Sequence, residues 1–310
     1  MTQNYRLKNI GLIDKNHKIS FIFNGKKYFG YKGDTLASAL IANGVHLIAR
    51  SFKYHRPRGI FGAGVDDPSA KVQLIKEGYS EPNVNLTEYE LVEGLELKSQ
   101  NCWPSVKLDI GEINNLLNRF FPAGFYYKTF MWPKSFWYRI YEPFIRKAAG
   151  FGVASLDPDP DRYEHQYEHC DVLVVGSGPS GLSSTLAAAK NGARVILAED
   201  KPRFGGSLLT DEVTIGNKKG EEWVDDVIAE LKSMPNVITK SRSQVFGYYD
   251  HNMLVMFERK RDHLQDPKNF TPREKLWYIR AKEVIISTGS IERPLVFSNN
   301  DRPGILLASA

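Results

Sequence analysis

The stretch Cys170–Asp200, CDVLVVGSGPSGLSSTLAAAKNGARVILAED, decides the fold of the second half of this chain. It opens with an apolar run typical of a buried strand, passes through a glycine-rich turn into a helix of small residues, and closes with a second apolar run. The glycines are spaced as Gly176-x-Gly178-x-x-Gly181, and Glu199 ends the second strand. This order predicts a Rossmann-like unit that binds a dinucleotide.

Each residue of this pattern has a physical task. Gly176 allows the tight turn off the strand, Gly178 lets the backbone approach a pyrophosphate, and Gly181 lets the helix pack close to the sheet. The helix start at Ser180 offers backbone N–H groups and the positive end of the helix dipole to the phosphates. Glu199 can accept hydrogen bonds from the adenosine ribose and would repel a 2′-phosphate, so NAD or FAD is favoured over NADP.

Further residues are predicted to complete the cofactor site. Asp200 and Lys201 follow the acid and should border the adenine side. Ser207, in a glycine-containing turn, can bond a phosphate or ribose, and Val245 should lie near the adenine at the end of the next strand. A later buried strand ends in the turn 287–289, which should return the chain beside the cofactor. The predicted cofactor-binding residues are Gly176, Gly178, Ser180, Gly181, Glu199, Asp200, Lys201, Ser207, Val245, Thr288 and Gly289.

Length and composition limit the class of protein. A chain of 310 residues with 42% apolar and 25% charged residues suggests about two globular domains. The net charge of +5 is too small to indicate nucleic acid binding by itself. No uncharged apolar window approaches the ~18 residues of a membrane span, so no membrane association is expected. The two cysteines, Cys102 and Cys170, predict a reducing, cytoplasmic location and no metal site. Cys102 has no histidine nearby in the sequence, Cys170 begins a buried strand, and no catalytic residue is predicted.

Residues 1–100 predict a small β-rich unit. Two alternating apolar runs flank Asn24-Gly25, a strong hairpin signal. A helix should follow, capped by Asp34 or Thr35 and ended by Asn43-Gly44. A hairpin, a helix, a glycine loop and later strands together indicate a ferredoxin-like β-grasp domain. The chain is therefore divided into this domain, an aromatic helical connector at 101–165, and the dinucleotide-binding domain at 166–310.

Two segments admit more than one interpretation. The aromatic residues of the connector could stack on bases, but burial between domains or subunits is the commoner use of such residues. The basic run at 50–58 could form a nucleic-acid patch, but nothing else in the chain supports nucleic acid binding. We therefore expect this run to pack against an acidic or polar surface of a protein partner.

Several long motifs carry a family resemblance. They include GDTLASALIANGV, SFKYHRPRGIFGAG, FPAGFYYKTFMWP, HCDVLVVGSGPSGL and TGSIERPLVFSNNDRPGI. With them the chain resembles the N-terminal part of the alpha subunit of heterotetrameric sarcosine oxidase. That family implies a complex that oxidatively demethylates sarcosine to glycine, with beta, gamma and delta subunits as partners. It also implies NAD in the alpha subunit and the reacting flavins on the beta subunit.

The resemblance also bears on the glycine loop at 59–70. Relatives among amine and proline dehydrogenases carry a C-x4-C-x2-C loop that holds an iron–sulfur cluster. Placed on this chain, the three cysteine positions fall on Phe61, Asp66 and Ser69. We therefore expect a ferredoxin-like domain without Fe-S ligands and without a cluster. A family alpha subunit is also about three times longer, so the dinucleotide-binding domain is expected to be truncated.

Three functions are compatible with these patterns. The first is a supporting, non-catalytic portion of an oxidoreductase subunit with bound NAD, inactive when alone. The second is a self-contained FAD-dependent oxidoreductase, which the glycine pattern alone slightly favours. The third is a dinucleotide-binding scaffold. The family resemblance favours the first.

Overall fold

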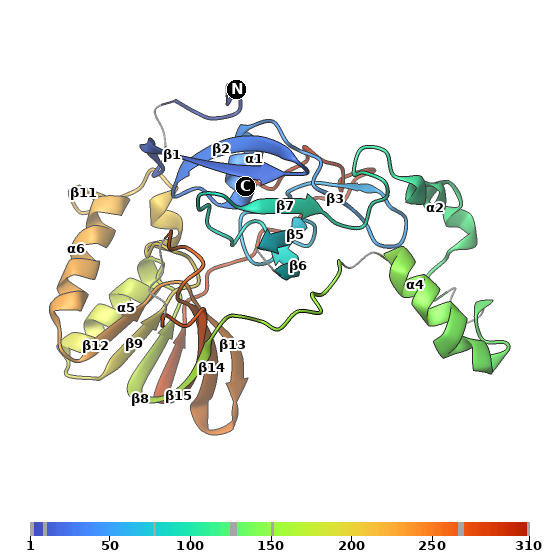
Figure 1. The fold of residues 1–310 in the computed structure, drawn as a ribbon. Coiled ribbons are helices and arrows are strands. Elements are labelled where there is room, and N and C mark those ends of the chain that lie inside the picture. Colours follow the sequence, from blue (N-terminus) through green and yellow to red (C-terminus); the bar gives the residue numbers. More distant parts are fainter. Residues whose placement is uncertain are drawn as a thin grey trace. The chain divides into compact units, whose positions relative to one another are not determined.

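The computed structural model describes residues 3–8, 11–76, 79–124, 129–149, 152–265 and 270–308. The chain separates into two compact units, Met1–Asp159 with Glu292–Ala310, and Pro160–Ile291. Each unit has its own sheet (Figure 1). Each also has its own buried apolar side chains.

The first unit is built around a five-stranded sheet with the order β2-β1-β7-β5-β6. Its elements are β1 (Asp14–Phe23), β2 (Lys26–Lys32), α1 (Leu36–Ala42), β3 (Ala49–Arg50), β4 (Pro57–Arg58), β5 (Lys71–Lys76), β6 (Tyr79–Asn85) and β7 (Glu96–Ser99). Strands β1 and β7 are parallel and the other neighbours are antiparallel. This mixed sheet with one helix is the predicted β-grasp arrangement.

Local sequence explains the start of this unit. Asn24 and Gly25 both adopt positive φ, as a tight hairpin turn requires, and they connect β1 to β2. Thr35 caps α1: its hydroxyl accepts a hydrogen bond from the N–H of Ser38, and the Ser38 hydroxyl accepts one from the N–H of Thr35. The helix ends at Asn43, as predicted. Leu36 and Leu40 on its buried face pack with inner side chains of the sheet, including Phe21, Leu74 and Leu97.

The connector contains only short helical pieces. They are η1 (Ile110–Glu112), α2 (Ile113–Leu116), η2 (Asn118–Phe120), η3 (Lys134–Phe136), the π-helix η4 (Trp137–Tyr141) and α4 (Glu142–Ala149). Large apolar side chains are exposed here, with Leu116, Trp132 and Tyr138 all more than 80% exposed. The predicted helices are therefore present in part. Within the described chain, these aromatic side chains are not buried.

The second unit is the α/β unit. Its elements are β8 (Tyr163–Val175), α5 (Pro179–Lys190), β9 (Val195–Ala198), η5 (Gly206–Leu209), β10 (Thr214–Ile215), β11 (Lys218–Lys219), α6 (Gly220–Ser233), β12 (Val237–Lys240), β13 (Ser243–Tyr249), η6 (Asp250–Asn252), β14 (Met253–Arg259) and β15 (Glu274–Ile286). The sheet order is β12-β9-β8-β15-β14-β13. The first four strands in this order are parallel, whereas β15, β14 and β13 form an antiparallel meander.

Two clusters of buried side chains cover the two faces of this sheet. One cluster joins α5 and α6 to β8 and β9, so both helices pack on the same face. The other joins Leu173, Ile196 and Ala198 to the meander residues Met256 and Ile279. The carboxyl ends of β8, β9 and β15 are thereby fixed side by side. Among the described residues, no helix is long and apolar enough to cross a membrane.

Candidate dinucleotide-binding site

The glycine loop follows β8 directly and makes close backbone contacts. Gly176 has a φ of +95°, and a Cβ there would lie 2.3 Å from the backbone oxygen of Ser287. A Cβ on Gly181 would lie 1.9 Å from the backbone oxygen of Gly176. Gly178 differs, because a Cβ there would meet no atom within 4 Å. Two glycines are thus required by packing, and the third faces open space where a ligand could approach.

Helix α5 begins at this loop and has no side-chain cap. Gly178 is its N-cap, and Pro179 occupies the first turn. Ser180 is exposed at the helix start, with its Oγ 3.5 Å from the Oγ of Ser287. The first N–H groups of a helix lack intrahelical partners, so this end can donate hydrogen bonds to an anionic group.

Glu199 lies at the end of β9 and is only 5% exposed. Its Oε2 accepts hydrogen bonds from the backbone N–H of Ser177 at 2.9 Å and from the Ser177 hydroxyl. Its Oε1 accepts one from the N–H of Lys201 at 3.0 Å. Burial, assisted by a hydrogen bond with Asp200, raises the pKa of Glu199 to about 7. The predicted ribose-binding carboxyl is therefore held against the glycine loop.

Sequence reasoning missed Ser177. This fully buried residue connects the two loops, because the N–H of Gly205 donates to both its backbone oxygen and its Oγ, each at 3.1 Å. The turn containing Ser207 begins next to Gly205, in η5, and Ser207 itself is exposed. The signal in the sequence was the hydroxyl residue between the first two glycines of the loop. Its role depends on side-chain geometry that spacing does not reveal.

The remaining predicted residues lie around the same edge of the sheet. Asp200 and Lys201 continue from Glu199, and the Asp200 backbone oxygen accepts a hydrogen bond from Arg259 at 2.6 Å. Val245 lies on β13, whose first residue Ser243 donates its N–H to the backbone oxygen of Glu199 at 2.7 Å. Val245 itself packs against the sheet core.

The turn after β15 also reaches this edge. The N–H of Ser287 donates to the backbone oxygen of Val175 at 2.7 Å, next to the glycine loop. Thr288 and Gly289 follow it and are exposed, and Gly289 has a φ of +68°. The structure therefore gathers the glycine loop, the 199–201 loop, the 205–207 turn and the 287–289 turn at one edge. Their roles toward a cofactor stay predictions.

The two cysteines lack the character of nucleophiles. Burial raises the pKa of the Cys102 thiol and of the Cys170 thiol to about 11 in each case. Both side chains therefore remain thiols at neutral pH. Across the part of the chain that the structure describes, no group of three or more His, Cys, Asp or Glu side chains is arranged to hold a metal ion.

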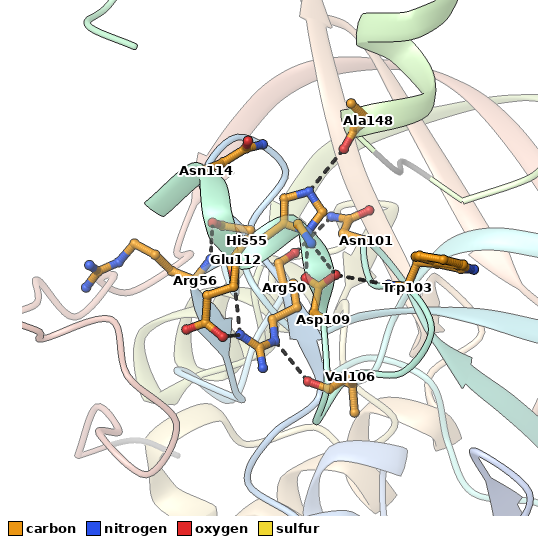
Figure 2. Close-up of polar contacts among 12 residues, drawn as sticks. Arg50, His55, Arg56, Asn101, Trp103, Val106, Asp109, Glu112, Asn114 and Ala148 are labelled. Carbon is orange, nitrogen blue, oxygen red and sulfur yellow. Dashed lines mark hydrogen bonds and ion pairs between the residues drawn. The ribbon is translucent and has the colours of Figure 1, made fainter. Parts of the chain in front are cut away.

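The basic run at 50–58 is engaged inside the first unit. Arg50 is 4% exposed and donates to the backbone oxygens of His55, Val106 and Lys107 and to Glu112 (Figure 2). His55 contacts Asp109 through Nδ1 at 2.6 Å and the Ala148 backbone oxygen through Nε2 at 3.2 Å. This network fastens the connector to the β-grasp sheet.

Arg56 and Arg58 bind a carboxylate within the same unit. Both guanidinium groups contact Asp301, and Arg56 does so through two hydrogen bonds of 2.8 and 2.7 Å. Hydrogen bonding from Arg56, and then from Arg58, holds the pKa of Asp301 well below its usual range. We expected these arginines to pack against a protein partner. In the structure they have an acceptor in the same chain, Asp301.

Asp67 organises the glycine loop at 59–70. Its carboxylate is 2% exposed and accepts four backbone hydrogen bonds of 2.7–2.8 Å. The donors are the N–H groups of Phe61, Gly62, Ser69 and Ala70. Asp66, which the sequence argument had singled out, is exposed. The carboxylate that holds the loop belongs instead to Asp67, the next residue.

Together, the doubly covered parallel strands, the glycine loop and the buried acid at the end of β9 define an α/β unit of the class found in flavin- and nicotinamide-linked oxidoreductases. Residues 171–252 match the family described as FAD dependent oxidoreductase. Residues 16–102 match the family described as 2Fe-2S iron-sulfur cluster binding domain.

Similarity to individual proteins is more specific than these family matches. The chain is 52% identical to the sarcosine oxidase subunit alpha of Rhizobium meliloti (strain 1021), over 99% of this chain and 31% of that protein. It is 34% identical to the sarcosine oxidase subunit alpha of Corynebacterium sp. (strain P-1), over 96% of this chain and 26% of that protein. The resemblance to alpha subunits of sarcosine oxidase is therefore confirmed. The chain spans less than a third of the length of these relatives.

A solved structure supports the fold. The L-proline dehydrogenase from P. horikoshii aligns with a TM-score of 0.62 and 20% sequence identity, over 96% of this chain and 46% of that chain. At this level of identity the likeness concerns the fold alone.

The match of residues 16–102 corrects one prediction. We expected a ferredoxin-like domain free of Fe-S ligands and without a cluster, and the match to a cluster-binding family overturns both statements. The reason is that the sheet and its glycine loop define the class of the domain, whereas the expectation rested on a count of thiols. The matched region of this chain contains one cysteine, Cys102. A 2Fe-2S site of the plant type uses four thiolates, which one thiol does not supply.

Proposed function

We propose that this chain is the dinucleotide-binding portion of an oxidoreductase subunit that supports the oxidative demethylation of sarcosine to glycine. The similarity to sarcosine oxidase alpha subunits supports the class of reaction and an action on the CH–NH group of sarcosine. The observation that carries the binding role is the meeting of the glycine loop, the Glu199 carboxyl and the 287–289 turn at one edge of the sheet.

The residues have distinct tasks in this proposal. The open backbone at Gly178 and the start of α5 receive the pyrophosphate, with Ser180 beside it. Glu199 accepts hydrogen bonds from the adenosine ribose, and Asp200 and Lys201 border the adenine. Ser207 and the exposed Thr288 contact the dinucleotide from the two flanking turns. These groups bind and orient; none of them carries out the amine oxidation.

NAD is the proposed dinucleotide, and FAD in the same site is the alternative. A carboxyl at Glu199 disfavours a 2′-phosphate, which argues against NADP. The match to the FAD dependent oxidoreductase family favours the alternative. The absorption spectrum of the purified chain separates the two, because bound FAD is yellow and bound NAD is colourless in the visible range.

A calorimetric titration tests the site itself. NAD should bind saturably at pH 8 and at least about tenfold more tightly than NADP. Glu199→Gln should weaken NAD binding by about tenfold, because it removes the charged acceptor of the ribose hydroxyls. Glu212→Gln is the matched control, since Glu212 is exposed and lies outside the site. Equal affinity for NAD and NADP, or an unaffected Glu199→Gln variant, would contradict the assignment.

The proposal includes partner subunits. The relatives are named as one subunit of an oxidase, which supports a complex with beta-type, gamma-type and delta-type chains and with flavins on a partner. The exposed apolar side chains of the connector, such as Trp132 and Tyr138, support an interface there. A pull-down of a beta-type subunit that Trp132→Ala weakens would agree with this. Turnover of sarcosine by the purified chain alone would disagree.

A further inference from the structure

The first unit contains a cavity that the proposed function does not use. Its volume is about 490 Å³, within the range of small-molecule pockets. The lining residues come from six separate parts of the first unit, at 49–52, 58–61, 68–71, 83, 100–101 and 300–305. It therefore exists only once the sheet, the glycine loop and the 300–305 segment have come together.

The charge of this cavity is positive. Four cations, Arg50, Arg58, Lys71 and Arg302, line it together with a single acid, Asp301. Arg50 is bound to Glu112 and to backbone oxygens, and Arg58 is bound to Asp301, so both are compensated (Figure 2 for Arg50).

The other two cations are uncompensated. Among the described residues, neither Lys71 nor Arg302 has a side-chain hydrogen bond or ion-pair partner. Two positive charges at the wall of one pocket repel each other, and each gains from a shared anion. The ligand should therefore carry a negative charge.

The rest of the wall is mainly apolar. Ile60, Phe61, Pro68 and Ile305 contribute apolar surface to the cavity. A small inorganic ion would leave this surface against water, whereas an organic anion with a flat apolar body would cover it. One polar atom also lacks a partner: Asn101 Oδ1 is buried without one in the described structure, while its Nδ2 donates to Arg50. An N–H or O–H of the ligand can satisfy this acceptor.

The walls are held in place before any ligand binds. The Asp67 carboxylate fixes the glycine loop through four backbone hydrogen bonds. Asp301 fixes the 300–305 segment to Arg56 and Arg58. A preformed pocket loses less conformational entropy on binding than a mobile one.

We propose that this cavity is a binding site for a small organic acid, held by Lys71 and Arg302 at its charged end and by the apolar wall at its other end. The site shares no residue with the proposed dinucleotide site, so either can fail without the other.

Benzoate is a suitable probe, because it combines one negative charge with a flat apolar body. Benzamide serves as its neutral counterpart of nearly the same shape, and acetate as a counterpart without the ring. Titrations followed by calorimetry or ligand-observed NMR should show saturable benzoate binding that weakens as salt is raised. Benzamide and acetate should each bind at least about tenfold more weakly than benzoate.

Variants locate the site. Lys71→Met and Arg302→Met should each weaken benzoate binding by at least about fivefold, whereas Lys71→Arg should retain it because the charge is kept. Lys98→Met is the matched control: Lys98 is exposed on β7 and lies outside the cavity, and its loss should change nothing. Ile305→Trp should fill the cavity and abolish binding without altering its charge.

Three results would overturn the proposal. They are the absence of saturable benzoate binding by the folded chain, equal binding of benzamide, and benzoate binding that survives both Lys71→Met and Ile305→Trp. Far-ultraviolet circular dichroism of each variant establishes that it is folded, so a loss of binding cannot be assigned to unfolding.

Discussion

The buried carboxyl of Glu199 should make the stability of the second unit depend on pH, and Glu199→Gln should remove that dependence. Its pKa is raised from 4.5 to about 7, chiefly by burial and then by the hydrogen bond with Asp200, against the opposing Ser177 hydroxyl and Lys201 N–H donors. In the unfolded chain the same carboxyl titrates at the ordinary value. The folded protein therefore holds one extra proton between these two pH values.

The sign and size follow from this difference. Below pH 4.5 the carboxyl is protonated in both states, and its stabilising contribution is fully present. As the pH rises through about 7 the folded state must hold a buried carboxylate, and that contribution is lost. Moving the pKa from 4.5 to about 7 corresponds to about 3 kcal/mol of unfolding free energy. The contribution of Glu199 to the unfolding free energy is thus lowest at the pH where its carboxylate is charged.

Urea unfolding at a series of pH values from 4.5 to 8.5 tests this expectation. The fluorescence of Trp277, which is 8% exposed in the second unit, reports the transition. The unfolding free energy of wild type minus that of Glu199→Gln should fall by about 3 kcal/mol across this pH range. The difference between wild type and Glu212→Gln, the control at an exposed position, should stay constant over the same range. Parallel profiles for wild type and Glu199→Gln would refute the reasoning.

Three further outcomes are expected. Asp67→Asn should lower the unfolding free energy of the first unit by about 3 kcal/mol, because two of the four backbone N–H groups lose their acceptor and the other two keep only a neutral amide oxygen. The exposed neighbour variant Asp66→Asn should be neutral in the same urea unfolding measurement. Gly181→Ala should cost about 3 kcal/mol and abolish dinucleotide binding in a titration, since its Cβ would overlap the backbone oxygen of Gly176. Asp301→Asn should cost only about 1 kcal/mol, because its ion pairs are partly exposed, and should speed hydrogen exchange of the 295–308 backbone as measured by mass spectrometry.

The sequence predicts what depends on neighbouring residues. The hairpin at Asn24-Gly25 and the cap at Thr35 are local, and both are present. The strand, glycine loop and helix from Cys170 are also local, because each step follows from spacing along a short stretch. The acid at Glu199 was placed at the correct edge for the same reason.

The rest depends on contacts between distant residues or on single side-chain conformations. Nothing in the pattern reveals that Asp301 binds Arg56, because 245 residues separate them. The central role of Asp67, instead of Asp66, depends on which of two adjacent carboxylates turns inward. The expectation that the β-grasp domain is cluster-free was wrong because absent thiols were given more weight than the sheet and loop around them.

The link between Asp301 and its two arginines affects how the protein is made. Arg58 and Asp301 are 243 residues apart, and the whole second unit lies between them in the chain. At ordinary rates of translation, a ribosome needs about 12–50 s to add that many residues. The first sheet can form early, but Arg56 and Arg58 gain their carboxylate only after the second unit has left the ribosome. Residues 160–291 are thus all synthesised before the ion pairs of Asp301 with Arg56 and Arg58 can form in the first unit.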